Sequence, residues 1–208
     1  MKKIAILLLF TLAATGAFAQ LGKSFGGGLL MDYSANNGLR RGNAKTGYNN
    51  FSFGTFIFID ATYAEIDVGF AFGSLSEYAK GGGVVVTSDA GNVIQFNFSV
   101  LGKYPVKLCE ITIFPLFGIS YNIVIYAKDE DGDKYTDWLI DNNSDFNQFG
   151  FLTGIGLDYD IIASLYFRAE ALFHLRLPMK YWKDTATSSF NKTLGVGPQI
   201  KVTLGYKF

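Results

Sequence analysis

The last stretch of the chain alternates between apolar and polar residues over its whole length. Apolar side chains stand at every second position from Leu194 to Phe208, and glycine, glutamine, lysine and threonine fill the positions between them. A period of two describes a long β-strand with one apolar and one polar face. A transmembrane β-barrel needs such strands, because each strand shows one face to lipid and the other to the lumen.

Seven earlier segments show the same alternation, and the connections between them are alternately long and short. In 62–73, for example, Ile66, Val68 and Phe70 alternate with Glu65 and Asp67. The proline at position 115 lies inside a predicted strand and predicts a bulge or local kink there. The predicted strands are 23–33, 49–59, 62–73, 92–104, 111–126, 148–159, 164–177 and 192–208, and the long connections are 34–48, 74–91, 127–147 and 178–191.

These strands predict an all-β fold, an eight-stranded antiparallel transmembrane β-barrel in a bacterial outer membrane. Short turns are then periplasmic and the four long loops extracellular. Segments of about 11–16 residues exceed the roughly 9–11 that a tilted strand needs to cross the bilayer. A water-soluble barrel of the lipocalin type is the structural alternative. It would turn its apolar face inward, where this chain carries Glu, Asp, Arg, Gln and Lys.

Residues 1–19 predict a secretory signal peptide. Two lysines precede an apolar core, and a small-x-small site ends at Ala19, before Gln20. The apolar stretch is shorter than the roughly 18 residues of a membrane anchor, and no cysteine follows the cleavage site to carry a lipid. The remaining segment, 20–208, suits a single barrel domain.

Composition agrees with a barrel and excludes several classes of protein. The chain contains 24 Gly, 20 Phe and 12 Tyr but only 4 Pro, as expected for strands flanked by aromatic girdles. Loss of the two signal-peptide lysines leaves 16 basic and 18 acidic residues, so no basic excess points to nucleic acid. Cys109 is the only cysteine and cannot form an intramolecular disulfide.

Several charged residues fall on the inward faces of the predicted strands. Eight strands enclose a lumen that is only just wide enough for side chains, and charges there are costly unless they are paired. We therefore expect a lumen salt-bridge network in which Arg168 bridges Glu65 or Asp67. The residues predicted for this network are Glu65, Asp67, Lys103, Arg168, Glu170 and Lys201.

The whole mature chain resembles the OmpA/OmpX class of small outer-membrane barrels. The resemblance rests on the signal peptide, eight alternating strands, Glu65, the Arg168-Ala169-Glu170 pattern and the terminal Phe208. It implies that Glu65 and Arg168 form a lumen salt bridge that plugs or gates a water path. Tyr206 and Phe208 also resemble the C-terminal signal by which the barrel-assembly machinery recognises its substrates. OmpW-like barrels are the second choice for the family that the chain resembles.

His174, the only histidine, falls on the inward face of its strand. Barrel enzymes that modify lipid A use a histidine with a serine and an acid, and the deacylase type places the serine two residues after the histidine. Arg176 stands at that position here. The sequence therefore favours a hydrogen-bonded lumen histidine over a hydrolase, and no enzyme activity or catalytic residue is predicted.

Two loop features have both a functional and a plain interpretation. The acidic run 129–133 lacks the glycine and glutamate spacing of a calcium loop, with Ile140 at the twelfth position, so no metal site or cofactor is predicted. Tyr181 and Trp182 suit interfacial anchoring, or alternatively a protein-binding hot spot.

The function expected from the sequence is a structural or surface-interaction role, with the loops presented outside the cell. A narrow gated pore, or an OmpW-like channel for small or hydrophobic molecules, is the alternative, and a lipid-A-modifying enzyme comes third. The expected partners are outer-membrane lipid, lipopolysaccharide or its equivalent, the assembly machinery and host or surface ligands of the loops, but not nucleic acid. A monomer is expected.

Overall fold

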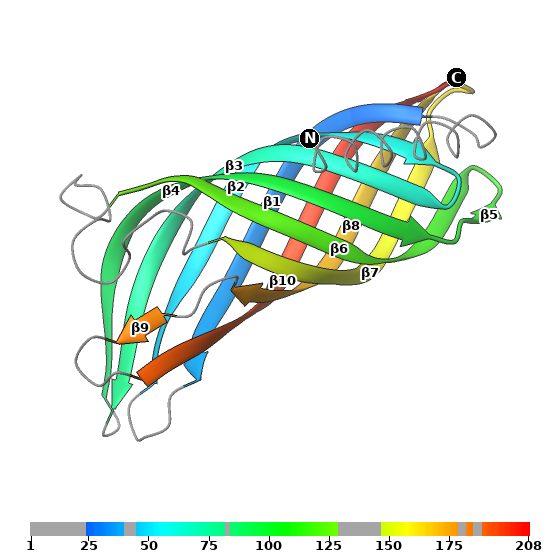
Figure 1. Ribbon diagram of the computed structural model, residues 1–208. Coiled ribbons are helices and arrows are strands. Elements are labelled where there is room, and N and C mark those ends of the chain that lie inside the picture. Colours follow the sequence, from blue (N-terminus) through cyan, green and yellow to red (C-terminus); the bar gives the residue numbers. More distant parts are fainter. Residues whose placement is uncertain (1–23, 40–44, 82–83, 129–146, 179–181, 185–188) are drawn as a thin grey trace, which may run out of the picture.

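Eight long antiparallel strands close into a barrel (Figure 1). The computed structural model describes residues 24–39, 45–81, 84–128, 147–178, 182–184 and 189–208. Neighbours along the chain pair with one another, and the first strand pairs with the last, so the sheet closes. The long strands are β1 (Ser24–Leu39), β2 (Lys45–Ala61), β3 (Ala64–Gly81), β4 (Val84–Lys103), β6 (Ile111–Lys128), β7 (Gln148–Asp160), β8 (Leu165–Pro178) and β10 (Ser189–Lys207).

Two short strands complete the sheet. β5 (Val106–Leu108) pairs with the start of β6, and β9 (Trp182–Asp184) pairs with the start of β10. Cys109 is exposed, unpaired and in the turn after β5, where its φ of 58° is the left-handed conformation that favours glycine.

The expectation of a bulge at Pro115 is wrong. Pro115 pairs in regular register with Ile155 of β7, and on its other side it lies opposite the break between β4 and β5. The missing N–H is tolerated there because the neighbouring ladder is interrupted. The register shifts fall instead between Leu75 and Ser76 in β3 and between Ile94 and Gln95 in β4.

The strands extend further than the sequence predicts. Most of the expected connections 34–48 and 74–91 is strand, because β1 continues to Leu39 and β3 continues to Gly81. In the sequences of these extensions polar and apolar residues do not alternate, which removes the pattern on which the prediction depends, whereas backbone pairing does not require it. At the other end β2 includes Asp60, for which the sequence predicts a turn.

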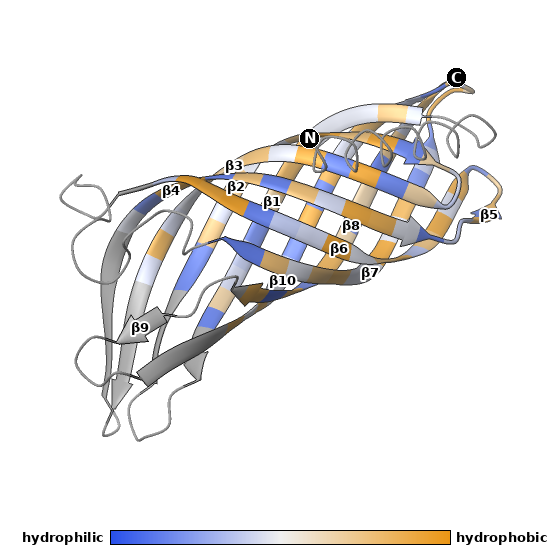
Figure 2. Cartoon of the chain, viewed as in Figure 1, coloured by the Kyte–Doolittle hydropathy of each residue, from blue (hydrophilic) through white to orange (hydrophobic). Residues whose placement is uncertain are grey.

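The predicted faces of the strands are confirmed. On β3, Phe70 and Phe72 point outward and are half exposed or more, while Glu65 and Asp67 point inward and are buried. The same alternation runs along β8 and β10, and Figure 2 shows it as alternating polar and apolar bands across the barrel wall. The barrel thus has an apolar exterior around a polar interior.

Aromatic side chains surround the barrel near its short turns. Tyr63 and Tyr104 stack with ring centroids 6.2 Å apart. Phe208 stacks on Phe25 at 5.4 Å and lies 5.9 Å from Tyr206, all three on the outer surface. Amphipathic rings at this level are typical of the membrane–water interface.

Among the residues that the structure describes, no helix is long and apolar enough to cross a membrane. The predicted signal peptide with its Ala19–Gln20 cleavage site, the acidic run 129–133 and Tyr181 lie outside these residues.

The face assignment predicts the effect of a charge on the exterior. Phe70 points outward from the middle of the membrane-crossing part of β3, so Phe70→Arg should lower the free energy of unfolding in phospholipid vesicles by about 2–4 kcal/mol. Urea titrations followed by circular dichroism measure this change. Phe70→Leu is the matched control and should stay near the wild type; equal stability of the Arg and Leu variants would contradict the assignment.

Candidate functional site: the charged lumen

Arg168 of β8 lies at the centre of a charged layer near the short turns, which we call the lower layer. Its Nε and Nη2 donate to the two carboxylate oxygens of Asp158 at 2.6 and 2.8 Å, and Nη2 also donates to Asp60 at 2.6 Å. Its Nη1 donates to Glu65. Because Arg168 is only 1% exposed and Glu65 is fully buried, these hydrogen bonds replace the water that both charges have lost.

Aromatic rings enclose the same guanidinium. Its Cζ atom lies 5.0 Å from the ring centroids of Phe58 and Phe114 and 5.2 Å from that of Tyr166. The Tyr166 hydroxyl in turn shares a hydrogen bond of 2.7 Å with Ser24. Rings within about 6 Å of a cation attract it, so acids and rings together fill the lumen at this level.

Two further cations extend this layer. Lys103 donates to Asp60 at 2.5 Å. Lys201 of β10 donates to Asp67 of β3, across the barrel, and its Nζ lies 3.5 Å from Glu170. Glu170 also lies 4.0 Å from Arg168, so the charges form one connected network.

A second polar layer crosses the lumen nearer the long-loop end. Arg176 of β8 donates to Asp32 of β1, and both side chains are buried. In the same part of the barrel, Gln148 donates to Asn36 at 2.9 Å, and Asn36 donates to Ser34 at 2.9 Å. This layer joins β1 to β7 and β8, from which β10 separates it in the barrel wall.

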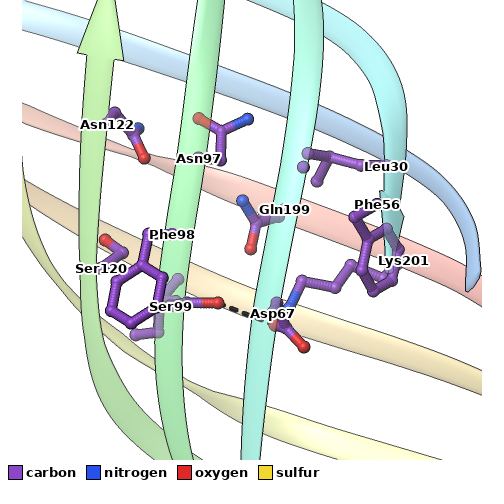
Figure 3. Close-up of a pocket in the computed structure, with 12 residues that line it drawn as sticks. Leu30, Phe56, Asp67, Asn97, Phe98, Ser99, Ser120, Asn122, Gln199 and Lys201 are labelled. Atoms are coloured by element: carbon purple, nitrogen blue, oxygen red, sulfur yellow. Dashed lines mark hydrogen bonds and ion pairs between the residues drawn. The ribbon is translucent and has the colours of Figure 1, made fainter. Parts of the chain in front are cut away.

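Between the two layers lies a small cavity of about 20 Å³, lined by polar and apolar side chains together (Figure 3). Asp67 of β3, Asn97 and Ser99 of β4, and Gln199 and Lys201 of β10 line it. The lumen is otherwise closely filled around it, since each of these strands contributes buried side chains at this level.

His174 pairs with Ser120 beside this cavity. The Ser120 hydroxyl and His174 Nε2 lie 2.6 Å apart, and both side chains are buried. A Cβ at Gly150 would lie 2.2 Å from that nitrogen, so glycine makes the room for the pair. Nδ1 of His174 has no hydrogen-bond partner, and the acid that a catalytic triad places there is therefore missing among the described residues.

The structure brings all six residues of the predicted network into one cluster, and of the two expected partners Glu65 is the one that contacts Arg168. Arg168 contacts Glu65, whereas Asp67 pairs with Lys201 and Lys103 pairs with Asp60. Among the residues that sequence analysis missed are Asp60 and Asp158, which bind Arg168, Asp32, which binds Arg176, and Ser120, which pairs with His174.

Asp158 could have been found in the sequence, because it shares its face with Gly150, Gly154 and Gly156 of the same strand. Asp60 could not, because both faces of 51–59 are rich in phenylalanine and isoleucine and hide which face is inward. Within the described ranges, no group of three or more His, Cys, Asp or Glu side chains could hold a metal ion.

No family model and no curated protein matches the chain. Among solved structures, the outer membrane protein OprG of Pseudomonas aeruginosa matches with a TM-score of 0.53 and 13% identity, over 90% of this chain and 96% of that chain. A major outer membrane protein of Thermus thermophilus has a TM-score of 0.42 at 13% identity, covering 88% and 99%. The attachment invasion locus protein Ail of Yersinia pestis has a TM-score of 0.37 at 12% identity, covering 91% and 100%.

At such low identity, the likeness to OprG concerns the fold alone. That fold, together with the apolar exterior and charged lumen, defines the class: the chain is a small eight-stranded outer-membrane β-barrel protein. Its location is the bacterial outer membrane, where a closed barrel satisfies the backbone hydrogen bonds that lipid cannot.

Removal of the central guanidinium should destabilise the barrel strongly. Arg168→Ala leaves Asp60, Glu65 and Asp158 without their shared cation, and we expect a loss of about 3–5 kcal/mol in the free energy of unfolding. Arg168→Lys should lose less, because it keeps the charge but not the forked geometry. Urea unfolding in lipid vesicles measures both.

Lys207→Ala is the matched control. Lys207 pairs with Asp160 at the rim, where its side chain is 36% exposed, so its removal should change stability by at most about 1 kcal/mol. An Arg168→Ala variant as stable as Lys207→Ala would show that the network does not support the fold.

Proposed function

We propose that the protein is a sealed barrel with a structural role in the outer membrane and a surface-interaction role at its extracellular end. The closed lumen carries this proposal. Arg168 and Arg176 are each 1% exposed, and each is bonded to strands that are not its neighbours in the sheet, so two layers of side chains separate the two ends.

The length of the strands supports the surface role. β3 and β4 contain 18 and 20 residues, whereas about 9–11 suffice to cross the membrane. With the short turns in the periplasm, the excess projects outward as a paired wall, β3 against β4 and β1 against β2. Such a wall continues the barrel beyond the membrane.

Transport is the second candidate, and the connected charges of the lower layer favour it over an enzyme. A gated pore needs that layer to open, because ions do not pass paired charges in a dry lumen. An OmpW-like route for hydrophobic molecules needs a continuous apolar path. The buried apolar clusters around Phe56 and around Leu101 include Phe58, Tyr166 and Phe114, the rings that enclose Arg168. The charges of the Arg168 network therefore interrupt the apolar interior, which argues against such a path.

A lipid-A-modifying enzyme has less support. The Ser120–His174 pair is buried inside the lumen, away from the lipid surface at which such a substrate lies, and no acid contacts His174 Nδ1. The aromatic and aliphatic exterior suits contact with outer-membrane lipid and lipopolysaccharide, and its continuity around the barrel suits a monomer.

Planar-bilayer recordings test the sealed state. The wild type should show no ion conductance, because both layers are intact. Arg168→Ala should show discrete openings that prefer cations, since the carboxylates of the lower layer then outnumber its cations further. Arg168→Lys should stay silent. Regular openings of the wild type would replace the structural proposal with the gated pore.

A further inference from the structure

The cavity between the two polar layers is lined by oxygen atoms that have no partner. Oδ1 of Asp67, Oδ1 of Asn97 and Oε1 of Gln199 are buried and accept no hydrogen bond in the part of the chain that the structure describes. Asp67 is 4% exposed and Gln199 is 6% exposed. A buried acceptor without a donor or cation is costly, so three around one cavity indicate a bound group.

Figure 3 shows how these groups lie relative to one another. Gln199 lies between Asn97 on one side and the Asp67–Ser99 pair on the other, with Lys201 beyond. Ser99 donates to Oδ2 of Asp67 at 2.7 Å, and Lys201 binds the same oxygen. Oδ1 of Asp67 therefore remains for another ligand.

The charged groups below the cavity include more acids than cations. The lower layer contains only three cations among the described residues, Lys103, Arg168 and Lys201, against a larger set of acids. Both carboxylate oxygens of Glu170 lack a hydrogen-bond donor. The connected acids are Asp60, Glu65, Asp67, Asp158 and Glu170, which leaves two negative charges in excess when all are ionised.

We propose that this cavity binds one monovalent metal cation of the size of Na⁺, held by Asp67, Asn97 and Gln199. Oxygen ligands select hard cations. A single carboxylate with amide oxygens suits one positive charge, and no set of three acidic or histidine ligands for a divalent ion exists among the described residues. A volume of about 20 Å³ admits one such ion or one water molecule.

The site ties opposite walls of the barrel together, because Asp67 and Asn97 lie on β3 and β4 whereas Gln199 lies on β10. An ion that binds only the folded state stabilises it, with an effect that grows with the logarithm of its concentration. The cation is thus a structural ligand of the closed barrel, and large ions are excluded by the size of the cavity.

Thermal unfolding in detergent tests the proposal. The purified wild type is heated in NaCl, CsCl or N-methylglucamine chloride at matched ionic strength and fixed pH, and unfolding is followed by circular dichroism. Na⁺ should raise the midpoint by roughly 5–10 °C at a hundred times its dissociation constant, relative to the other two cations. Gln199→Leu should remove this difference, because it replaces the amide oxygen with a side chain of similar size.

Gln95→Leu is the control for the substitution itself. Gln95 is a buried lumen amide on β4 that donates to Ser52 and does not line the cavity, so this variant should lose stability yet keep the Na⁺ effect. Asn97→Leu replaces Gln199→Leu if that variant does not fold. Equal midpoints in all three salts overturn the proposal and leave a water molecule in the cavity. If the unfolding midpoint rises on acidification and does not respond to Na⁺, the proposal is overturned, and the excess acids are instead neutralised by protonation.

Discussion

The guanidinium of Arg168 must be neutralised inside a lumen that side chains nearly fill, and the arrangement of the barrel's short-turn end follows from this constraint. Its partners come from several strands: Asp60 from β2, Glu65 from β3 and Asp158 from β7. Rings from β2, β6 and β8 fill the remaining space around it. One side chain therefore connects five of the eight long strands and closes the lumen at the same time.

The rings reach Arg168 only because small residues face them. A Cβ at Gly156 would lie 2.1 Å from the ring of Phe114, and one at Gly205 would lie 2.2 Å from that of Tyr166. Both glycines occupy inward positions, next to strands that carry the bulky side chain. The high glycine content therefore serves the packing of the lumen as well as the wall itself.

How well the sequence predicts this structure depends on whether a strand face meets lipid or the lumen. Lipid tolerates only apolar side chains, so the outward positions of β3, β8 and β10 are correctly predicted. The lumen accepts both Phe58 and Asp60 on one strand, so alternation fails there and the inward acid is missed. Strand ends beyond the membrane, such as that of β3 at Gly81, carry no apolar face to detect. Pairing over an intervening strand, as between Ser120 of β6 and His174 of β8, depends on the register of three strands and has no local signal.

The excess of acids links closure to ion preference. Arg168 and Lys201 are each shared by two or more carboxylates. The nearest oxygens of Glu170 lie as far as 4.0 Å from Arg168 and 3.5 Å from Lys201. Such a layer attracts cations and repels anions. A cation held in the cavity above it would relieve the repulsion between the acids and favour the closed state, whereas water entering between the acids would give them solvation and favour an open one. More acidic than basic side chains face the lumen. This inequality thus underlies both the resting closure of the barrel and the ion selectivity of any opening.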